Sequence, residues 1–94
     1  MQVKVRYFAY LRQLTNEVKE EEISLPDDAT IRDLLNVLVE KYGEKLEKVL
    51  FESSQRKTLS ENIIVLINGQ SVNDLGTKLK NGDIVSIMPF LSGG

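Results

Sequence analysis

Residues 30–43 read TIRDLLNVLVEKYG and carry the strongest structural pattern in the chain. Thr30 and Asp33 have the spacing of a capping box, in which the hydroxyl accepts from a free amide and the carboxylate lies near the positive end of the helix dipole. Gly43 can supply the left-handed residue that closes a helix. The apolar residues between these ends form one stripe at helical spacing: Ile31, Leu34, Leu35, Leu38, Val39 and Tyr42. The stretch therefore predicts a helix with one face buried in a core.

Strand patterns precede this helix. Between Gln2 and Ala9 apolar and polar residues alternate with a period of two, which is typical of a strand with one buried face. Residues 21–25 alternate in the same way, and the turn residues that begin at Pro26 end this second strand. Residues 11–16, between the two strands, predict a short helical turn or a loop.

Further strands follow the helix. Residues 62–67 are apolar on both faces, as expected for a strand that is covered on both sides or lies inside a sheet. Asn68-Gly69 predicts a tight hairpin turn, with a short return strand starting near Val72. Residues 83–88 predict the last strand, and we expect the chain to leave the sheet at Pro89 because proline has no amide donor.

This order of elements predicts an α+β domain, in which a mixed sheet carries the helix on one face. Residues 46–50 add a further helical turn, and the polar residues 52–58 predict a mobile loop. Because 94 residues suit a single core, we expect one domain over residues 1–89 and a flexible tail over residues 90–94.

The composition excludes several classes of function. The chain has no Cys, His or Trp, so thiol nucleophiles, imidazole bases, disulfides and Cys/His zinc sites are absent. Its net charge of −2 is unlike that of a protein that binds nucleic acid. The longest apolar runs are five residues, and Lys4 and Arg6 stand where a signal peptide needs an apolar segment. We therefore expect a cytoplasmic protein that binds neither membrane nor nucleic acid.

Two internal features of the sequence suggest ligand sites but lack the residue spacing that such sites require. The segment from Gly69 to Lys78 has the wrong spacing for a phosphate-binding loop, so we expect an ordinary turn region there. An acidic cluster could suggest a hard-cation site, but it lacks EF-hand spacing and is expected to be a solvated surface that could still steer a basic partner. Its members are Glu17, Glu20, Glu21, Glu22, Asp27 and Asp28.

The C-terminus is the most distinctive feature of the sequence. From Ile84 to Gly94 no side chain is charged, and two terminal glycines arise by chance in roughly one chain in two hundred. Gly93 and Gly94 lack Cβ atoms, so a partner could enclose their backbone in a narrow channel. Phe90 and Leu91 could anchor the tail in a partner or fold back onto the chain's own core.

The terminal carboxylate would be the reactive group of such a tail. Its ordinary pKa is about 3.5, so at neutral pH it is an anion that resists nucleophilic attack. Because this chain has no credible nucleotide site, an external enzyme that uses ATP would have to convert the terminus into an acyl adenylate before sulfur or an amine could attack.

Several segments together resemble the ubiquitin-like sulfur carriers, particularly the small subunit of molybdopterin synthase, and the related archaeal ubiquitin-like small modifier proteins. The resemblance covers essentially the whole chain and differs from many synthase subunits at Phe90, where they have a second proline, and in a longer connection over residues 44–61. The matching segments are residues 3–9, the helix after residues 28–30, residues 67–69 with Val72, and residues 79–85 leading through Pro89 to the final Gly-Gly.

The resemblance implies a β-grasp, or ubiquitin-like, fold of about five strands and one main helix, with the first and last strands parallel at the centre of the sheet. It also implies a non-catalytic subunit that binds no cofactor or metal. A ubiquitin-activating-like adenylyltransferase would use ATP to adenylate Gly94, and a sulfur donor would convert it to a thiocarboxylate. The tail of Gly93, Ser92, Leu91 and Phe90 would then insert into the large subunit of molybdopterin synthase, where sulfur reaches a precursor of the molybdenum cofactor.

Three alternatives remain at this point. The same activation could join Gly94 to lysines of target proteins, as small protein modifiers do. The chain could instead be a sulfur carrier of the thiamine pathway, whose members share the Gly-Gly end and are generally shorter. It could also be a plain interaction domain whose terminal glycines are incidental.

Overall fold

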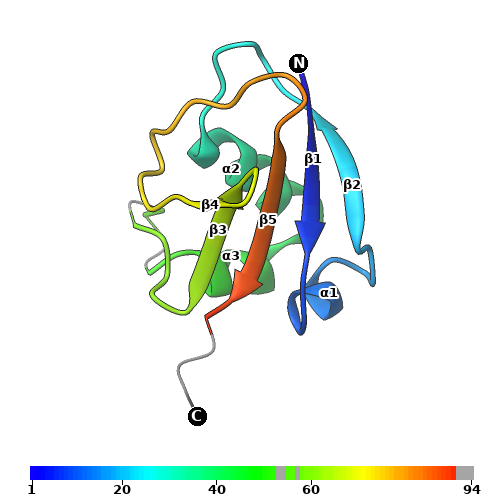
Figure 1. The fold of residues 1–94 in the computed structure, drawn as a ribbon. Coiled ribbons are helices and arrows are strands. Elements are labelled where there is room, and N and C mark those ends of the chain that lie inside the picture. The colour runs from blue at the N-terminus through cyan, green and yellow to red at the C-terminus, as the bar shows by residue number, and fades with distance from the viewer. Residues whose placement is uncertain (53–54, 57, 91–94) are drawn as a thin grey trace.

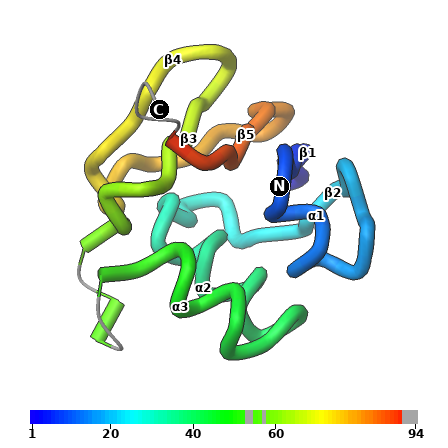
Figure 2. Tube along the Cα trace, turned by 90° about the horizontal axis from the view of Figure 1, so that it is seen from below, coloured from blue at the N-terminus to red at the C-terminus, as the bar shows by residue number. Residues whose placement is uncertain are grey.

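The protein is described by a computed structural model over residues 1–52, 55–56 and 58–90. A five-stranded mixed sheet carries helices on one face (Figures 1 and 2). This arrangement confirms the predicted α+β class. The strands are β1 (Gln2–Tyr7), β2 (Glu20–Ser24), β3 (Ile63–Ile67), β4 (Gln70–Ser71) and β5 (Ile84–Pro89), and the helices are α1 (Leu11–Leu14), α2 (Ile31–Tyr42) and α3 (Glu44–Leu50).

The first and last strands lie side by side at the centre of the sheet, which has the order β2-β1-β5-β3-β4. β1 and β5 are parallel, with Val5 opposite Val85 and Tyr7 opposite Ile87, and every other neighbouring pair is antiparallel. The parallel central pair that the resemblance implied is therefore confirmed.

The core fills the space between the sheet and α2. Thr30 begins the helix with the predicted capping box: its Oγ1 accepts from the Asp33 amide, and the Asp33 carboxylate accepts from the Thr30 amide at 2.8 Å. Gly43 ends the helix at φ 102°, which a glycine adopts readily. The buried side chains of the helix and the central strands include Ile31, Leu34, Leu35, Leu38 and Val39 from α2 and Val3, Val5, Tyr7, Ile63, Val65, Val85 and Ile87 from the sheet.

The structure changes some of the expected element bounds. Residues 44–50 form a helix, α3, which is longer than the single turn expected over residues 46–50. The return strand β4 starts at Gln70 rather than near Val72, directly after the predicted tight turn. In that turn Asn68 and Gly69 both have positive φ angles, 51° and 87°, as a type I′ turn requires.

The loop predicted over residues 52–58 is tied to the helices where the structure describes it. Its ends are joined by a hydrogen bond from the Glu52 amide to the Thr58 carbonyl at 3.0 Å. Arg56 donates to the carboxylate of Glu47 on α3 and to the side chain of Asn36 on α2. Residues 53, 54 and 57 lie outside the described residues, so the mobility expected of this loop stays a prediction.

The inward face of edge strand β2 carries one charged side chain, Glu21, which is only 13% exposed. Its carboxylate accepts hydrogen bonds from the Tyr7 hydroxyl at 2.7 Å, the Tyr42 hydroxyl at 2.5 Å and the Lys41 ammonium. Burial by itself raises the pKa of Glu21, but the bonds from Lys41, Tyr42 and Tyr7 outweigh burial and hold it below its ordinary value. Burial and the neighbouring carboxylate raise the pKa of both tyrosines, which therefore stay neutral donors.

Within the described residues, no helix has the length and apolar character needed to cross a membrane. No group of three or more acidic, His or Cys side chains in the same part of the chain could hold a metal ion.

We expect Glu21→Gln to lower the free energy of unfolding at pH 7 by roughly 1–3 kcal/mol, because it removes the charge that holds Lys41 and both tyrosines. A carboxyl whose pKa is lowered by folding stabilises the protein above its unfolded pKa and loses that contribution as pH falls. Urea unfolding at pH 7 and at pH 3 measures both effects. The variant should lose less stability than the parent between the two pH values, and an equal loss would contradict this account.

Candidate functional site at the end of the last strand

β5 continues further than expected. Pro89 pairs with Ile63, and the Phe90 amide donates to the Asn62 carbonyl at 2.7 Å. The prediction that the chain leaves the sheet at Pro89 is therefore wrong, because the ladder with β3 extends to Phe90.

The geometry of the antiparallel ladder explains why Pro89 is tolerated. Opposed residues alternate between pairs that exchange hydrogen bonds and pairs that do not. Because Phe90 and Asn62 are hydrogen-bonded, the neighbouring pair of Pro89 and Ile63 does not exchange hydrogen bonds. The nitrogen of Pro89 therefore points away from β3. It points toward the side of β1, which ends at Tyr7, so the missing amide removes no bond from the ladder with β3.

Phe90 is the first of the predicted tail residues and the last residue that the structure describes. Its side chain is 51% exposed and is not part of the buried core, so it does not fold back onto this chain. The other residues predicted for the site, Leu91, Ser92, Gly93 and Gly94, lie outside the described residues. Their predicted roles, and the predicted boundary between domain and tail, stay predictions.

An apolar surface lies beside the end of β5 on the face of the sheet away from the helices. Ile64 pairs with Met88 across β3 and β5, and the Phe8 amide donates to the Ile87 carbonyl, which keeps Phe8 level with Met88 on the other side of β5. All three side chains are partly buried and alternate with core residues. We call Phe8, Ile64, Met88 and Phe90 the exit patch.

The sequence reasoning missed the exit patch, although a signal was present. Residues 62–67 are apolar on both faces, which predicts a strand that is covered on both sides or lies inside a sheet. β3 does lie inside the sheet, between β5 and β4. No helix covers its outer face in the part of the chain that the structure describes, as Figure 2 shows.

The outer face changes character toward β2. Lys4 and Arg6 on β1 form ion pairs with Glu20 at 3.5 and 3.1 Å. Arg12 follows at the end of the sheet where β1 and β5 end, with its guanidinium 5.8 Å from the centroid of the Phe8 ring. The outer face is thus apolar over β3 and β5 and charged over β1 and β2.

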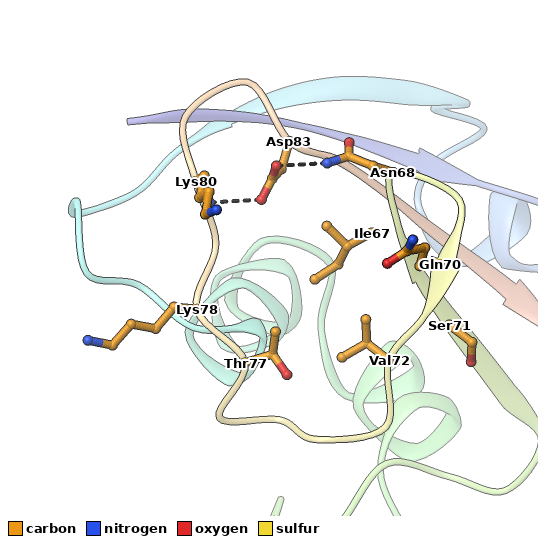
Figure 3. Close-up of a pocket in the computed structure, with 9 residues that line it drawn as sticks. All are labelled: Ile67, Asn68, Gln70, Ser71, Val72, Thr77, Lys78, Lys80 and Asp83. Atoms are coloured by element: carbon orange, nitrogen blue, oxygen red, sulfur yellow. Dashed lines mark hydrogen bonds between the residues drawn. The ribbon is translucent and has the colours of Figure 1, made fainter.

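A pocket of about 430 Å³ opens at the opposite end of β5 (Figure 3). Asp83, which is buried there, accepts hydrogen bonds from the side chain of Asn68 at 2.9 Å and from the Lys80 amide at 2.8 Å. Because both carboxylate oxygens are occupied by the protein itself, this acid holds the turn after β3 against the start of β5. The pocket is lined by Ile67, Asn68, Gln70, Ser71, Val72, Thr77, Lys78, Lys80 and Asp83.

This pocket is remote from the C-terminal end of the strand. From Asp83 to Phe90 the extended chain spans roughly 20 Å. The segment from Gly69 to Lys78 contains β4 and then turns around the pocket. It contains no helix, in agreement with the turn region that the sequence predicts. The pocket and the C-terminal end of β5 are therefore separate features of the molecule.

Comparison with known proteins gives a consistent match over the whole chain. The family model described as ThiS family matches residues 5–94. A putative sulfur carrier protein of Archaeoglobus fulgidus is 33% identical, with all of both chains covered. A molybdopterin synthase sulfur carrier subunit of Drosophila yakuba is 32% identical over 98% of this chain and 90% of its own length.

Solved structures agree with these matches. The solution structure of small archaeal modifier protein 1 from Methanosarcina acetivorans superposes with a TM-score of 0.80 at 35% identity and covers 99% of this chain and 96% of its own. The β-grasp fold that the resemblance implied is therefore confirmed.

The two faces of the sheet should respond differently to truncation. Ile87 is 1% exposed, so Ile87→Ala should lower the free energy of unfolding by about 3 kcal/mol. Met88→Ala, on the outer face, should change it by less than about 1 kcal/mol, because that side chain does not pack in the core. Equal losses in urea unfolding experiments would show that the outer face is packed in the free protein.

Proposed function

Because the chain belongs to the ThiS family, whose members are small ubiquitin-like sulfur carriers and modifiers, we propose that Gly94 is the residue on which it carries sulfur. The observation that carries the proposal is the uncharged end of the chain, which finishes on Gly93-Gly94 directly after a central strand of the sheet.

The geometry at the end of β5 supports this role. The strand is held by β1 up to Ile87 and by β3 up to the bond between Phe90 and Asn62. Only four residues follow that bond, and none of them has a charged side chain. A rigid domain that presents a short, narrow terminus suits a partner that must bring a backbone carboxylate to its own catalytic groups.

The chemistry at Gly94 requires an enzyme from outside. Attack of the carboxylate oxygen on the α-phosphorus of ATP releases pyrophosphate and gives an acyl adenylate. Hydrosulfide supplied by a sulfur donor then attacks the carbonyl carbon, the bond to AMP breaks, and a thiocarboxylate remains at Gly94. We propose an adenylyltransferase of the ubiquitin-activating type as the partner that catalyses both steps.

The acceptor that we propose is a precursor of the molybdenum cofactor. The relative in Drosophila yakuba is named as the sulfur carrier subunit of molybdopterin synthase, and it aligns over nearly the whole of both chains. In this role the chain is the small, non-catalytic subunit, and its tail enters the large subunit. The large subunit then supplies the groups that transfer sulfur.

A second candidate function is conjugation to proteins. The likeness to a small archaeal modifier protein, at 35% identity and nearly full coverage, favours it. The same acyl adenylate would be attacked by a lysine amine of a target instead of by sulfur, and an isopeptide bond at Gly94 would result. The two functions share the activation step and differ in the nucleophile that follows it.

Protein purified from its own host should contain a fraction in which one oxygen of Gly94 is replaced by sulfur. Intact mass detects this replacement, but oxidation of Met1 or Met88 adds nearly the same mass. Fragmentation of the peptide released after Lys80 separates the two, because fragments that begin at Pro89 contain Gly94 and no methionine.

Deletion of Gly94 is the matched control. It removes the activated residue and leaves every described residue in place, so the fold should be retained and the sulfur adduct should disappear. Isopeptide links from Gly94 to target lysines, without any thiocarboxylate, would favour the modifier function. If the truncated protein supported every role of the intact one in its host, neither function at Gly94 would stand.

A further inference from the structure

We propose that the open edge of β2, along Glu20, Glu22 and Ser24, binds an extended basic segment of a partner protein as an additional antiparallel strand. In that segment Lys or Arg alternates with apolar residues. β1 separates this edge from β5, so the inference concerns a surface apart from the exit patch. It does not depend on the chemistry proposed at Gly94.

β2 offers the longer of the two open edges of the sheet. The strand order β2-β1-β5-β3-β4 leaves one side of β2 and one side of β4 without a neighbouring strand among the described residues (Figure 1). β4 has only two residues, whereas β2 has five, which is a usual strand length. β2 contains no proline and no residue with a positive φ angle, so its backbone can accept another strand.

The backbone groups of Glu20, Glu22 and Ser24 point away from β1. The Leu25 amide donates to the Met1 carbonyl at 2.8 Å, so this pair is hydrogen-bonded. Bonded and non-bonded pairs alternate along antiparallel strands, and the amides and carbonyls of the non-bonded residues face the other side of the strand. Within the part of the chain that the structure describes, the backbone groups of these three residues have no hydrogen-bond partner. They are therefore available to a strand from outside.

The charge along this edge favours a basic partner. Residues 17–28 hold six carboxylates and one lysine, although the net charge of the whole chain is only −2. On the outer face, Glu20 is paired with Lys4 and Arg6, whereas Glu22 is exposed and forms no ion pair with a described residue. Charges on an edge strand discourage pairing with neutral or acidic strands, so this edge is selective for a strand that brings positive charge.

A second copy of this chain is a poor occupant of the edge. Antiparallel pairing of two β2 strands about an axis at Glu22 would place the two Glu22 side chains opposite each other, and an axis at Glu21 would place Glu20 opposite Glu22. Like charges directly opposite each other destabilise a pair of strands. β1 has the pattern that β2 accepts, because Lys4 is opposite Glu22 and Arg6 is opposite Glu20. The strand that we propose has the same alternation.

The inner side of the edge offers an apolar contact. Lys41 on α2 donates to Glu21 on β2, so this side of the helix lies next to the strand. Val37 is one helical turn before Lys41 on the same side of α2, and it is 38% exposed. The side chains of an added strand alternate between the two faces. Its basic residues therefore lie on the outer face beside Glu20 and Glu22, and its apolar residues lie on the side of Val37.

The test uses the intact protein and a capped synthetic peptide of sequence SVKVRVS, with amide hydrogen exchange measured by NMR. At saturating peptide, exchange of the amides of Glu20, Glu22 and Ser24 should slow at least tenfold, because these amides gain partners. The amides of Glu21 and Ile23 should change little, since they bond to β1 in the free protein. A peptide with the sequence SVEVEVS should protect none of the three edge amides.

N-methylation gives a pair of matched peptides. Methyl groups on the backbone nitrogens of Lys and Arg remove the two amides that would bond to Glu22 and Glu20, and they should weaken binding at least tenfold. Methyl groups on the nitrogens of the two valines beside Lys, which point away from β2, should change the dissociation constant less than about threefold. Equal binding of both methylated peptides would overturn the proposed strand pairing.

Glu22→Lys tests the charge at the edge and should raise the dissociation constant of SVKVRVS at least tenfold at 0.15 M salt. Glu61→Lys is the matched control, because it makes the same change in net charge at an exposed residue that precedes β3, and it should leave binding within about twofold. Thermal unfolding should confirm that both variants are folded. Unchanged binding to Glu22→Lys would overturn the selection by charge. Slow exchange of the three edge amides without peptide would show that another copy already covers the edge, and the proposal would fall.

Discussion

The parallel pairing of β1 with β5 is the constraint on which the rest of this structure depends. It joins the first and last strands of the domain at the centre of the sheet, with Val5 opposite Val85 and Tyr7 opposite Ile87. β2 then extends the sheet beyond β1, and β3 and β4 extend it beyond β5. Because the last strand is central, it is held by β1 up to Ile87 and by β3 up to Phe90.

The two faces of the sheet have separate roles. The inner face and the stripe of α2 form the core, in which side chains such as Val5, Leu34 and Ile87 are almost fully buried. The outer face lacks a helical cover over the described residues, and it is apolar over β3 and β5. An apolar surface of this kind, which is not needed for the core, is typical of a site that contacts a partner.

Two carboxylates that the structure removes from solvent, Glu21 and Asp83, stabilise the fold. Glu21, which belongs to the acidic cluster, faces the core and holds Tyr7, Tyr42 and Lys41. An inward charge on the edge strand β2 also discourages pairing with other chains. Asp83 holds the turn after β3 against β5. Both carboxylates are engaged by donors of this chain, which gives each of them a structural role.

Local patterns in the sequence were enough to predict the α2 helix with its capping box, the strand β1 and the turn at Asn68-Gly69. The uncharged Gly-Gly terminus is visible in the sequence itself. Each of these depends on residues within a few positions of one another, where spacing alone carries the information. The position of Phe90 in the ladder, the three donors around Glu21 and the exit patch could not be read in this way. They depend on partners far away in the chain, such as Asn62 for Phe90, and only the packing of the strands brings those partners together.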